Sequence, residues 1–176
     1  IKSFELLGCN FDVNNLITVF PHPCCEDIFV AAILDACHMV KLARNCFSDY
    51  KIINIPGIGQ AKWTYIDMLE SKQSKEGLTL ANRITKRHVD YKNQKMKVTL
   101  ATQVFSNSVS KALEYLRKSN CEDFSNTFPT ELLLERIDKL FDILNTRSTF
   151  NSGYKLAITF NNVISHLKFL AEMKNF

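Results

Sequence analysis

The apolar positions in the second part of the chain recur every three or four residues, which is the period of a helix with one buried face. This pattern predicts helices over residues 61–72, 78–87, 98–117 and 162–173. A further helix is expected to start near Pro129, because the first turn of a helix accepts proline. The segment 98–117 has the clearest apolar face, formed by Val98, Ala101, Phe105, Val109, Ala112, Leu113 and Leu116.

The first part of the chain has a different pattern, in which the apolar runs are short. They cover 4–11, 16–20, 29–34 and 52–55, and the segment 37–46 has helical character. Short apolar runs bounded by proline and glycine favour strands. Pro56 and the glycines after it end this part of the chain. We therefore predict an α+β protein, with an α/β segment over 1–56 and a mainly α-helical domain over 57–176.

One acidic residue, Asp35, lies where the apolar run 29–34 gives way to the predicted helix 37–46. A carboxylate at the end of a buried strand needs a metal, a cation or water to stabilise it. Phosphoryl-transfer enzymes hold Mg²⁺ in this way, but an aspartate at this junction can also be the N-cap of the helix, and the spacing alone favours the cap. His38, Lys41 and Arg44 follow on the helix, where they either serve such a site or a DNA phosphate, or are ordinary helix residues.

The composition is that of a globular protein, with 176 residues, 46% of them hydrophobic, 13 Phe and a formal net charge of +4. This weakly basic balance permits an anionic partner but does not require one. The first residues lack the features of a signal peptide, and no segment has the roughly 20 apolar residues of a membrane span. We expect no membrane association, and we expect the chain to be a fragment of a longer protein.

The six cysteines show neither a CxxC pair nor a disulfide pattern. A zinc site could be drawn from Cys24, Cys25, Cys37 and His38, but directly adjacent ligands suit a tetrahedral site poorly. Reduced cysteines of an intracellular protein explain this spacing better.

Basic residues gather between positions 83 and 97, with only Asp90 opposing them: Arg83, Lys86, Arg87, Lys92, Lys95 and Lys97. This block leads into the predicted helix at Val98, whose first backbone N–H groups attract anions. It fits either a solvated surface or an anion-binding segment. The GxxxxGK[ST] spacing of a phosphate-binding loop is missing, so these residues alone do not establish nucleotide binding.

A second candidate is the pair Phe141 and Asp142. Phe141 falls on the apolar face of the helix after Pro129, where core packing is the usual role. Asp142 has Asp138 four residues before it, on the same side of the helix. A ring beside a carboxylate can stack on a base and accept hydrogen bonds from guanine N1–H and its 2-amino group. Simple surface exposure is the alternative for Asp142.

Several segments together resemble the transposases of the P-element superfamily, in particular those with an N-terminal THAP zinc-finger domain. They read FPHPCCEDIFVAAILDACHMVKLARNCFSD, QSKEGLTLANRITKRHVDYKNQKMKVTLATQVFSNSV, LFDILNTRS and GYK, in the order of the family. The resemblance implies part of a ribonuclease-H-like catalytic domain, interrupted by an insertion domain that binds guanosine triphosphate (GTP). One departure is Arg83, which stands where the family usually has Lys.

This resemblance implies roles for individual residues. Asp35 would be one of three acidic residues that hold two Mg²⁺ ions during DNA cleavage and strand transfer, with the other two outside this chain. The expected contacts of the guanine nucleotide are Lys95, Lys97, Val98, Ser106, Ser108, Phe141 and Asp142.

At the level of the whole protein, the resemblance implies a nuclear, GTP-dependent cut-and-paste DNA transposase. Its partners would be the DNA of transposon ends and target, and a homo-oligomer of the full-length protein is compatible with it. We expect the fragment alone to be inactive. The alternatives are a domesticated, non-catalytic module that binds DNA or protein, and a helical interaction module without a ligand.

Overall fold

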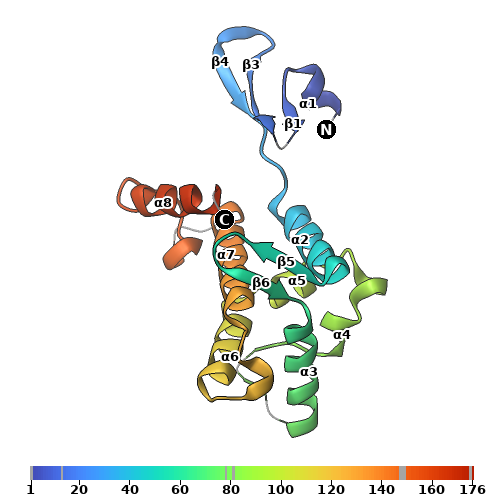
Figure 1. Ribbon diagram of the computed structural model, residues 1–176. Helices are drawn as coiled ribbons and strands as arrows, with labels where there is room; N and C mark the ends of the chain where they lie inside the picture. The colour runs from blue at the N-terminus through green and yellow to red at the C-terminus, as the bar shows by residue number, and fades with distance from the viewer. Residues whose placement is uncertain (1, 13, 78, 81, 147–149, 175) are drawn as a thin grey trace. The chain divides into compact units, whose positions relative to one another are not determined.

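The computed structural model describes residues 2–12, 14–77, 79–80, 82–146, 150–174 and 176. The chain divides into two compact units, Ile1–Asp35 and Ala36–Phe176 (Figure 1). The described strands all pair as two-stranded antiparallel sheets, and the rest of the regular structure is helical. The predicted α+β class is confirmed. No helix in the described residues is long and apolar enough to cross a membrane.

The first unit consists of a short helix and two hairpins. Its elements are α1 (Lys2–Leu6), β1 (Asn10–Asp12), β2 (Asn15–Ile17), β3 (Val19–His22) and β4 (Cys25–Ala31). The ring of Phe4 lies 6.3 Å from the rings of both Phe11 and Phe20, so aromatic packing joins the helix to the hairpins. The predicted buried strand over 29–34 is wrong in its end and in its burial, because β4 ends at Ala31 and Phe29 is 69% exposed.

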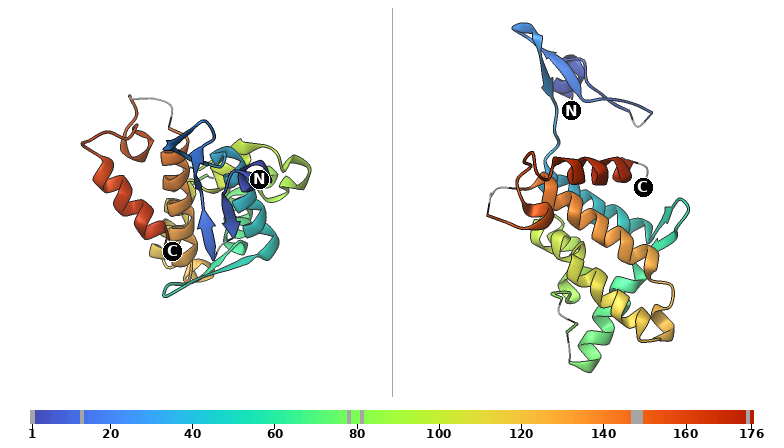
Figure 2. Two further views of the ribbon diagram at one scale, coloured as in Figure 1. Left: turned by 90° about the horizontal axis from the view of Figure 1, so that it is seen from above. Right: turned by 90° about the vertical axis from the view of Figure 1, so that its left-hand side faces the viewer.

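The second unit is mainly helical and contains one hairpin (Figure 2). Its elements are α2 (Ala36–Tyr50), β5 (Ile52–Ile55), β6 (Gly59–Lys62), α3 (Thr64–Glu76), α4 (Lys86–Val89), the 3₁₀ turn η1 (Tyr91–Gln94), α5 (Val98–Val104), α6 (Asn107–Lys118), η2 (Glu122–Phe124), α7 (Phe128–Leu144), η3 (Gly153–Lys155) and α8 (Val163–Lys174).

The core of the second unit is aromatic and begins on α2. The ring of Phe47 lies 5.4 Å from that of Trp63 and 6.4 Å from that of Phe105, and all three side chains are buried. Ile55 and Ala61 of the β5–β6 hairpin belong to the same cluster. Helix α2 and strand β5, which precede the predicted boundary between residues 56 and 57, therefore pack with the helical residues in a compact unit that starts at Ala36. The assignment of the two parts to a catalytic segment and an insertion stays a prediction.

The glycines after Pro56 form the turn between β5 and β6. Gly57 has a φ of 72°, which only glycine adopts without strain, and the hairpin register pairs Ile55 with Gly59. The segment after Pro56 is therefore a tight turn within a hairpin. Because Gly59–Lys62 is a strand, helix α3 starts at Thr64 rather than at residue 61.

The predicted single helix over 98–117 is wrong, because the chain breaks at Phe105 and Ser106. Ser106 has extended backbone angles and caps α6, with its Oγ accepting the N–H of Val109 at 3.4 Å. Phe105 is 1% exposed and points its ring at the core. A local cap and a buried aromatic ring together outweigh the continuous helical period.

The predicted helix over 78–87 is also wrong in its described residues, since only Lys86–Val89 form α4. The amide of Gln73 accepts hydrogen bonds at 2.9 Å from the N–H of Leu80 and from Nδ2 of Asn82. Asn82 Oδ1 in turn accepts the N–H of Ile84 at 2.9 Å. These side-chain bonds satisfy backbone groups that a helix would otherwise use.

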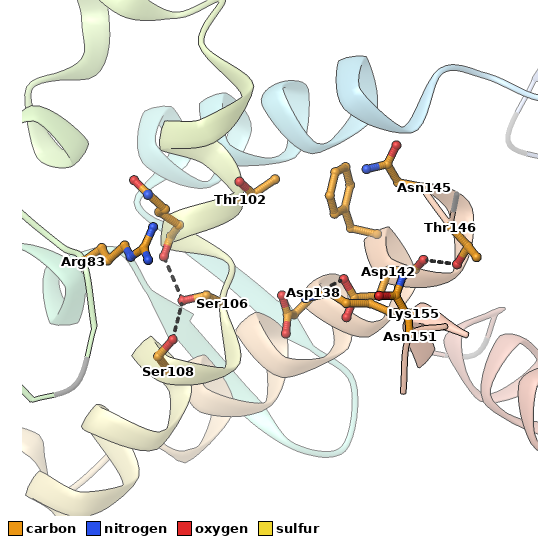
Figure 3. Close-up of a pocket in the computed structure, with 12 residues that line it drawn as sticks. Arg83, Thr102, Ser106, Ser108, Asp138, Asp142, Asn145, Thr146, Asn151 and Lys155 are labelled. Carbon is orange, nitrogen blue, oxygen red and sulfur yellow. Dashed lines mark hydrogen bonds and ion pairs between the residues drawn. The ribbon is translucent and has the colours of Figure 1, made fainter. Parts of the chain in front are cut away.

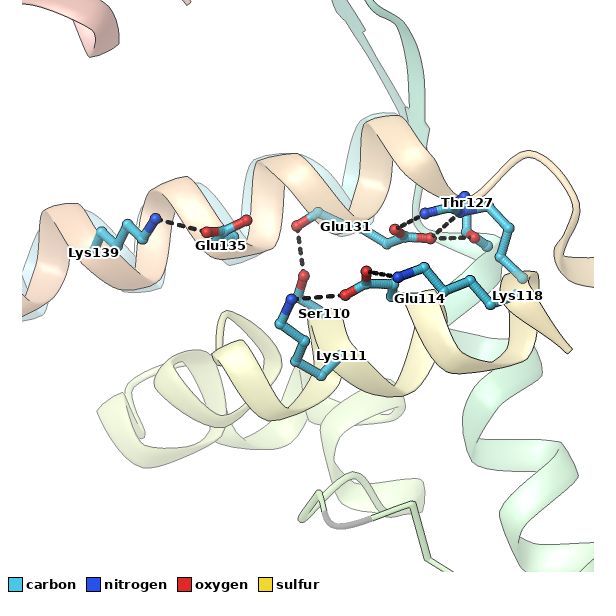
Figure 4. A network of polar contacts seen from close by, with 9 residues as sticks. Ser110, Lys111, Glu114, Lys118, Thr127, Glu131, Glu135 and Lys139 are labelled. Atoms are coloured by element: carbon cyan, nitrogen blue, oxygen red, sulfur yellow. Dashed lines mark hydrogen bonds and ion pairs between the residues drawn. The ribbon is translucent and has the colours of Figure 1, made fainter. Parts of the chain in front are cut away.

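Helix α7 packs against α2 and α6, and a buried polar network fixes it to α6 (Figure 4). Glu131 accepts two bonds of 2.9 Å from Arg117 and one of 2.6 Å from Thr127 Oγ1. Ser110 Oγ donates to the Glu131 carbonyl at 2.9 Å. Because every one of these groups has a partner, the two helices are held in a defined register.

Candidate functional site

A cavity of the second unit lies between the α5–α6 break and the last two turns of α7 (Figure 3). Its volume is about 660 Å³, within the range of small-molecule sites. The residues that line it are Arg83, Thr102, Gln103, Ser106, Ser108, Asp138, Phe141, Asp142, Asn145, Thr146, Asn151 and Lys155. The lining combines hydroxyls, carboxylates, amides, cations and one aromatic ring.

Four of the predicted contact residues lie together in this cavity: Ser106, Ser108, Phe141 and Asp142. They come from two helices that are distant in sequence, so the structure brings together two segments that were proposed separately. Asp35 is not among the lining residues.

The other three predicted contacts, Lys95, Lys97 and Val98, lie outside the cavity lining. Lys97 is the residue before α5, and both lysines are exposed. Thr102, on the same helix, does line the cavity. The α-helical rise of about 1.5 Å per residue separates Val98 from Thr102 by roughly 6 Å along the axis. Lys95 and Lys97 therefore precede the helix that carries Thr102, but they do not form the cavity wall.

The hydroxyl side of the cavity depends on the break after α5. Ser106 Oγ donates to the Gln103 carbonyl at 2.9 Å and lies 3.5 Å from Ser108 Oγ, as Figure 3 shows. A continuous helix would place Ser106 differently, because only its extended backbone makes it the cap of α6. The break between α5 and α6, which the predicted continuous helix lacked, therefore positions Ser106 in this wall.

A buried histidine holds Gln103 in the wall. The Thr85 N–H donates to His88 Nδ1 at 3.1 Å, so that nitrogen is an acceptor in the neutral ring. The proton is therefore assigned to Nε2, which donates to Gln103 Oε1 at 2.8 Å. His88 is 4% exposed and acts through Gln103 rather than by facing the cavity.

The acidic side of the cavity is formed by Asp138 and Asp142, one turn apart on α7. Burial and the neighbouring charge of Asp142 raise the pKa of Asp138 to about 6, although the Asn107 N–H donates to its Oδ2 at 3.2 Å. Burial also raises the pKa of Asp142, and Lys155, whose Nζ is 3.5 Å from Asp142 Oδ1, opposes that change. In Figure 3 these three side chains lie across the cavity from Arg83 and the two serines.

The sequence did not single out most of the polar lining: Thr102, Gln103, Asn145, Thr146, Asn151 and Lys155. Asn145 and Thr146 lie three and four residues after Asp142, so helical spacing could have found them. Thr146 Oγ1 donates to the Asp142 carbonyl at 2.7 Å. Lys155 comes from η3, beyond the end of α7, and only the tertiary structure places it beside Asp142.

Asp35, the predicted metal ligand, is exposed and directly precedes α2. Among the residues that the structure describes, no three His, Cys, Asp or Glu side chains gather into a group that could hold a metal ion. One carboxylate does not make a Mg²⁺ site. The described residues therefore do not fit a complete metal centre, and the position of Asp35 remains compatible with a helix cap.

The sequence matches known proteins over most of its length. Residues 37–157 match the family of the TNP-like, GTP-binding insertion domain. Human DNA transposase THAP9 is 34% identical over 155 residues, which cover 88% of this chain and 17% of the relative. The transposable element P transposase of Drosophila melanogaster is 29% identical over 149 residues, covering 84% and 19%.

A solved structure has the same fold. It is the Drosophila P element transposase strand transfer complex, with a TM-score of 0.77 and 24% identity, covering 89% of this chain and 35% of that one. This chain spans less than a fifth of the length of the curated relatives that it matches. The family match covers the α2–α7 region that builds the cavity. The chain belongs to the TNP-like, GTP-binding insertion domain family and is related to the P-element transposases.

Proposed function

We propose that Ala36–Phe176 binds GTP in the cavity between α5–α6 and α7, as part of a DNA transposase. The observation that carries this proposal is the meeting of Phe141 and Asp142 with Ser106 and Ser108 around one cavity of about 660 Å³. The family match supports GTP as the ligand. The cavity offers an aromatic ring and carboxylates for a base, and hydroxyls and cations for the sugar and phosphates.

The base would lie at the α7 side of the cavity. An ionised Asp142 accepts two hydrogen bonds, which matches the N1–H and 2-amino donors that guanine has and adenine lacks. Lys155 favours the ionised form of Asp142 and is close enough, at 3.5 Å, to keep the carboxylate in place. Phe141 is partly buried against the core and offers part of its ring to the cavity.

The phosphates would lie toward the basic residues. Arg83 lines the cavity, and Lys95 and Lys97 are exposed residues that precede α5, the helix whose Thr102 also lines it. Charge-assisted hydrogen bonds from such groups are about twice as strong as neutral ones. Lys95, Lys97 and Val98 remain predicted contacts, since they require the ligand to extend beyond the cavity wall.

The activity of the whole protein is part of the same proposal. The relatives are named as transposases, and the solved neighbour is a strand transfer complex, which supports DNA as a partner and the nucleus as the location. Asp35 would supply one ligand of a Mg²⁺ site whose other ligands are not among the described residues. A homo-oligomer of the full-length protein belongs to this proposal as well.

Calorimetric titration of the protein with GTP and with adenosine triphosphate (ATP) tests the proposal. We expect a single GTP site and weaker binding of ATP, because adenine lacks the N1–H and 2-amino groups that would donate to Asp142. Guanosine diphosphate is the control for the phosphate end, and it should bind more weakly than GTP if the lysines contact the third phosphate. No binding of GTP, or equal binding of GTP and ATP, would contradict the proposal.

A further inference from the structure

One arginine is entirely buried in the core of the second unit. Arg44 lies in the middle of α2 and is 0% exposed. Its helical spacing with Lys41 left two alternatives open, a face that meets a DNA phosphate or acidic groups and a solvated face, and the burial of Arg44 fits neither. A fully buried arginine is rare unless it is paired, because desolvating the cation is unfavourable.

The contacts of Arg44 are unusual for a buried cation. Its Nη2 donates to the Lys95 carbonyl and its Nε to Asn45 Oδ1, each at 2.9 Å. The guanidinium carbon lies 3.8 Å from the centre of the Tyr91 ring. Nη1 has no hydrogen-bond partner, and no ion pair joins Arg44 to an acidic residue in the described part of the chain. Burial accordingly lowers the pKa of Arg44.

These contacts do not explain Arg44 as a source of stability. Replacing a buried ion pair with apolar side chains of similar volume is often neutral or stabilising, and Arg44 has no acidic partner among the described residues to offset its desolvation. Two of its three partners nevertheless belong to one segment, since Tyr91 is the first residue of η1 and Lys95 is the residue just after it, whereas Asn45 lies on α2 itself. Arg44 therefore contacts both ends of the turn that leads into Lys97 and α5.

We propose that Arg44 is a positioning residue for the nucleotide, because it holds the lysine segment, residues 91–97, in the conformation that presents Lys95 and Lys97 to the phosphates. The inference rests on the proposed GTP site and adds to it a residue that does not touch the ligand. The Tyr91 ring stacks on the guanidinium and fixes its plane, and the hydrogen bond to the Lys95 carbonyl fixes the position of the backbone at Lys95. The N–H of Lys97 then bonds to the Gln94 carbonyl at 3.0 Å, which continues the same turn.

The most informative variant is Arg44→Met, which keeps an unbranched apolar stem and removes the guanidinium with its charge and donors. We expect it to fold with at most a modest loss of melting temperature, because it removes an unfavourably buried charge but leaves the Lys95 carbonyl and Asn45 Oδ1 each without a donor. We expect its affinity for GTP and for ATP to fall by the same factor, about tenfold, because the lysines read charge and not the base. Arg44→Lys should also lose affinity, because one ammonium cannot both stack on Tyr91 and reproduce the planar fork.

A matched control and a double variant separate positioning from general packing. Val40→Ala, one turn earlier on α2 and 4% exposed, should lower the melting temperature and leave nucleotide affinity unchanged. If Arg44 acts through the lysines, the losses in Lys97→Ala and Arg44→Met should not add when the two are combined.

Each outcome of this experiment has a meaning. Unchanged affinity in Arg44→Met and Arg44→Lys, or losses that add fully with Lys97→Ala, would overturn the positioning role. If Arg44→Met does not fold, Arg44→Lys and its combination with Lys97→Ala give the same comparison. If the unaltered protein binds neither nucleotide, the proposed function itself fails, and the inference fails with it.

Discussion

The two halves of helix α7 carry the same kind of side chain in opposite circumstances. In its first half, the carboxylate of Glu131 is 7% exposed and is fully engaged by Arg117 and Thr127. In its second half, Asp138 and Asp142 face a cavity, are repelled by each other, and have raised pKa values. A buried carboxylate with all its partners in place fixes the packing of two helices. Carboxylates that face a cavity and have raised pKa values are instead typical of functional sites.

The largest effect is expected when the paired carboxylate is removed. Glu131→Ala leaves Arg117 without its partner and Thr127 Oγ1 without an acceptor, so it should destabilise the fold by about 3 kcal/mol. For a domain of this size the melting temperature should drop by on the order of 10 °C. Thermal unfolding followed by circular dichroism measures it. Glu131→Gln, which retains an acceptor, is the control and should lose less; equal small losses in both would contradict a structural role.

The cavity carboxylate Asp138 should behave in the opposite way. Because its pKa in the folded state, about 6, lies above the ordinary value of 3.8, its contribution to stability is complete below pH 3.8 and is lost as the pH rises through about 6. Asp138→Asn keeps an acceptor for the Asn107 N–H and removes the charge. The group is partly solvated, so the gain at pH 8 should be about 1 kcal/mol, which is less than the full shift would give.

Unfolding curves at pH 4 and pH 8 test this expectation. The melting temperature of Asp138→Asn should exceed that of the unaltered protein at pH 8 by about 3 °C and should match it at pH 4. A difference of the same size at both pH values would show that the carboxylate is not titrating in the folded protein.

The smallest effect on stability is expected when an exposed ion pair near the middle of α7 is removed. Glu135 and Lys139 form an i,i+4 pair at 2.6 Å, and both side chains are about one-third exposed. Glu135→Ala should therefore change stability by at most about 0.5 kcal/mol, and salt should remove part of that difference. Melting curves at low and high salt measure it. A loss as large as that of Glu131→Ala would end the distinction between paired, buried carboxylates and exposed ones.

The sequence predicted those parts of the structure that depend on local periodicity. The α+β class was predictable, as were α2, α3, α7 and α8 within a few residues of their ends. Ser106 and Ser108 were named on one helix, and Phe141 and Asp142 on another. The spacing along each helix identified the face, although it could not show that the two faces meet.

The features that escaped prediction depend on contacts between distant residues. Phe105 breaks the helix because its ring packs against Phe47, and Arg44 is buried because its partners are Tyr91 and Lys95. Lys155 joins the site through an ion pair with Asp142. No helical or strand period encodes such contacts, so the structure was needed to find them.

The central claim is that Asp142 reads guanine in the cavity of α7, and the ratio of GTP to ATP affinity in Asp142→Ala tests it most directly. Asp49→Ala, a change of an exposed carboxylate on α2, is the control. Loss of hydrogen bonds to a charged partner, worth roughly 1.5–3 kcal/mol, should reduce the guanine preference by about one to two decades, while ATP binding changes little. A ratio in Asp142→Ala equal to that of the unaltered protein would contradict the claim and would place base recognition elsewhere.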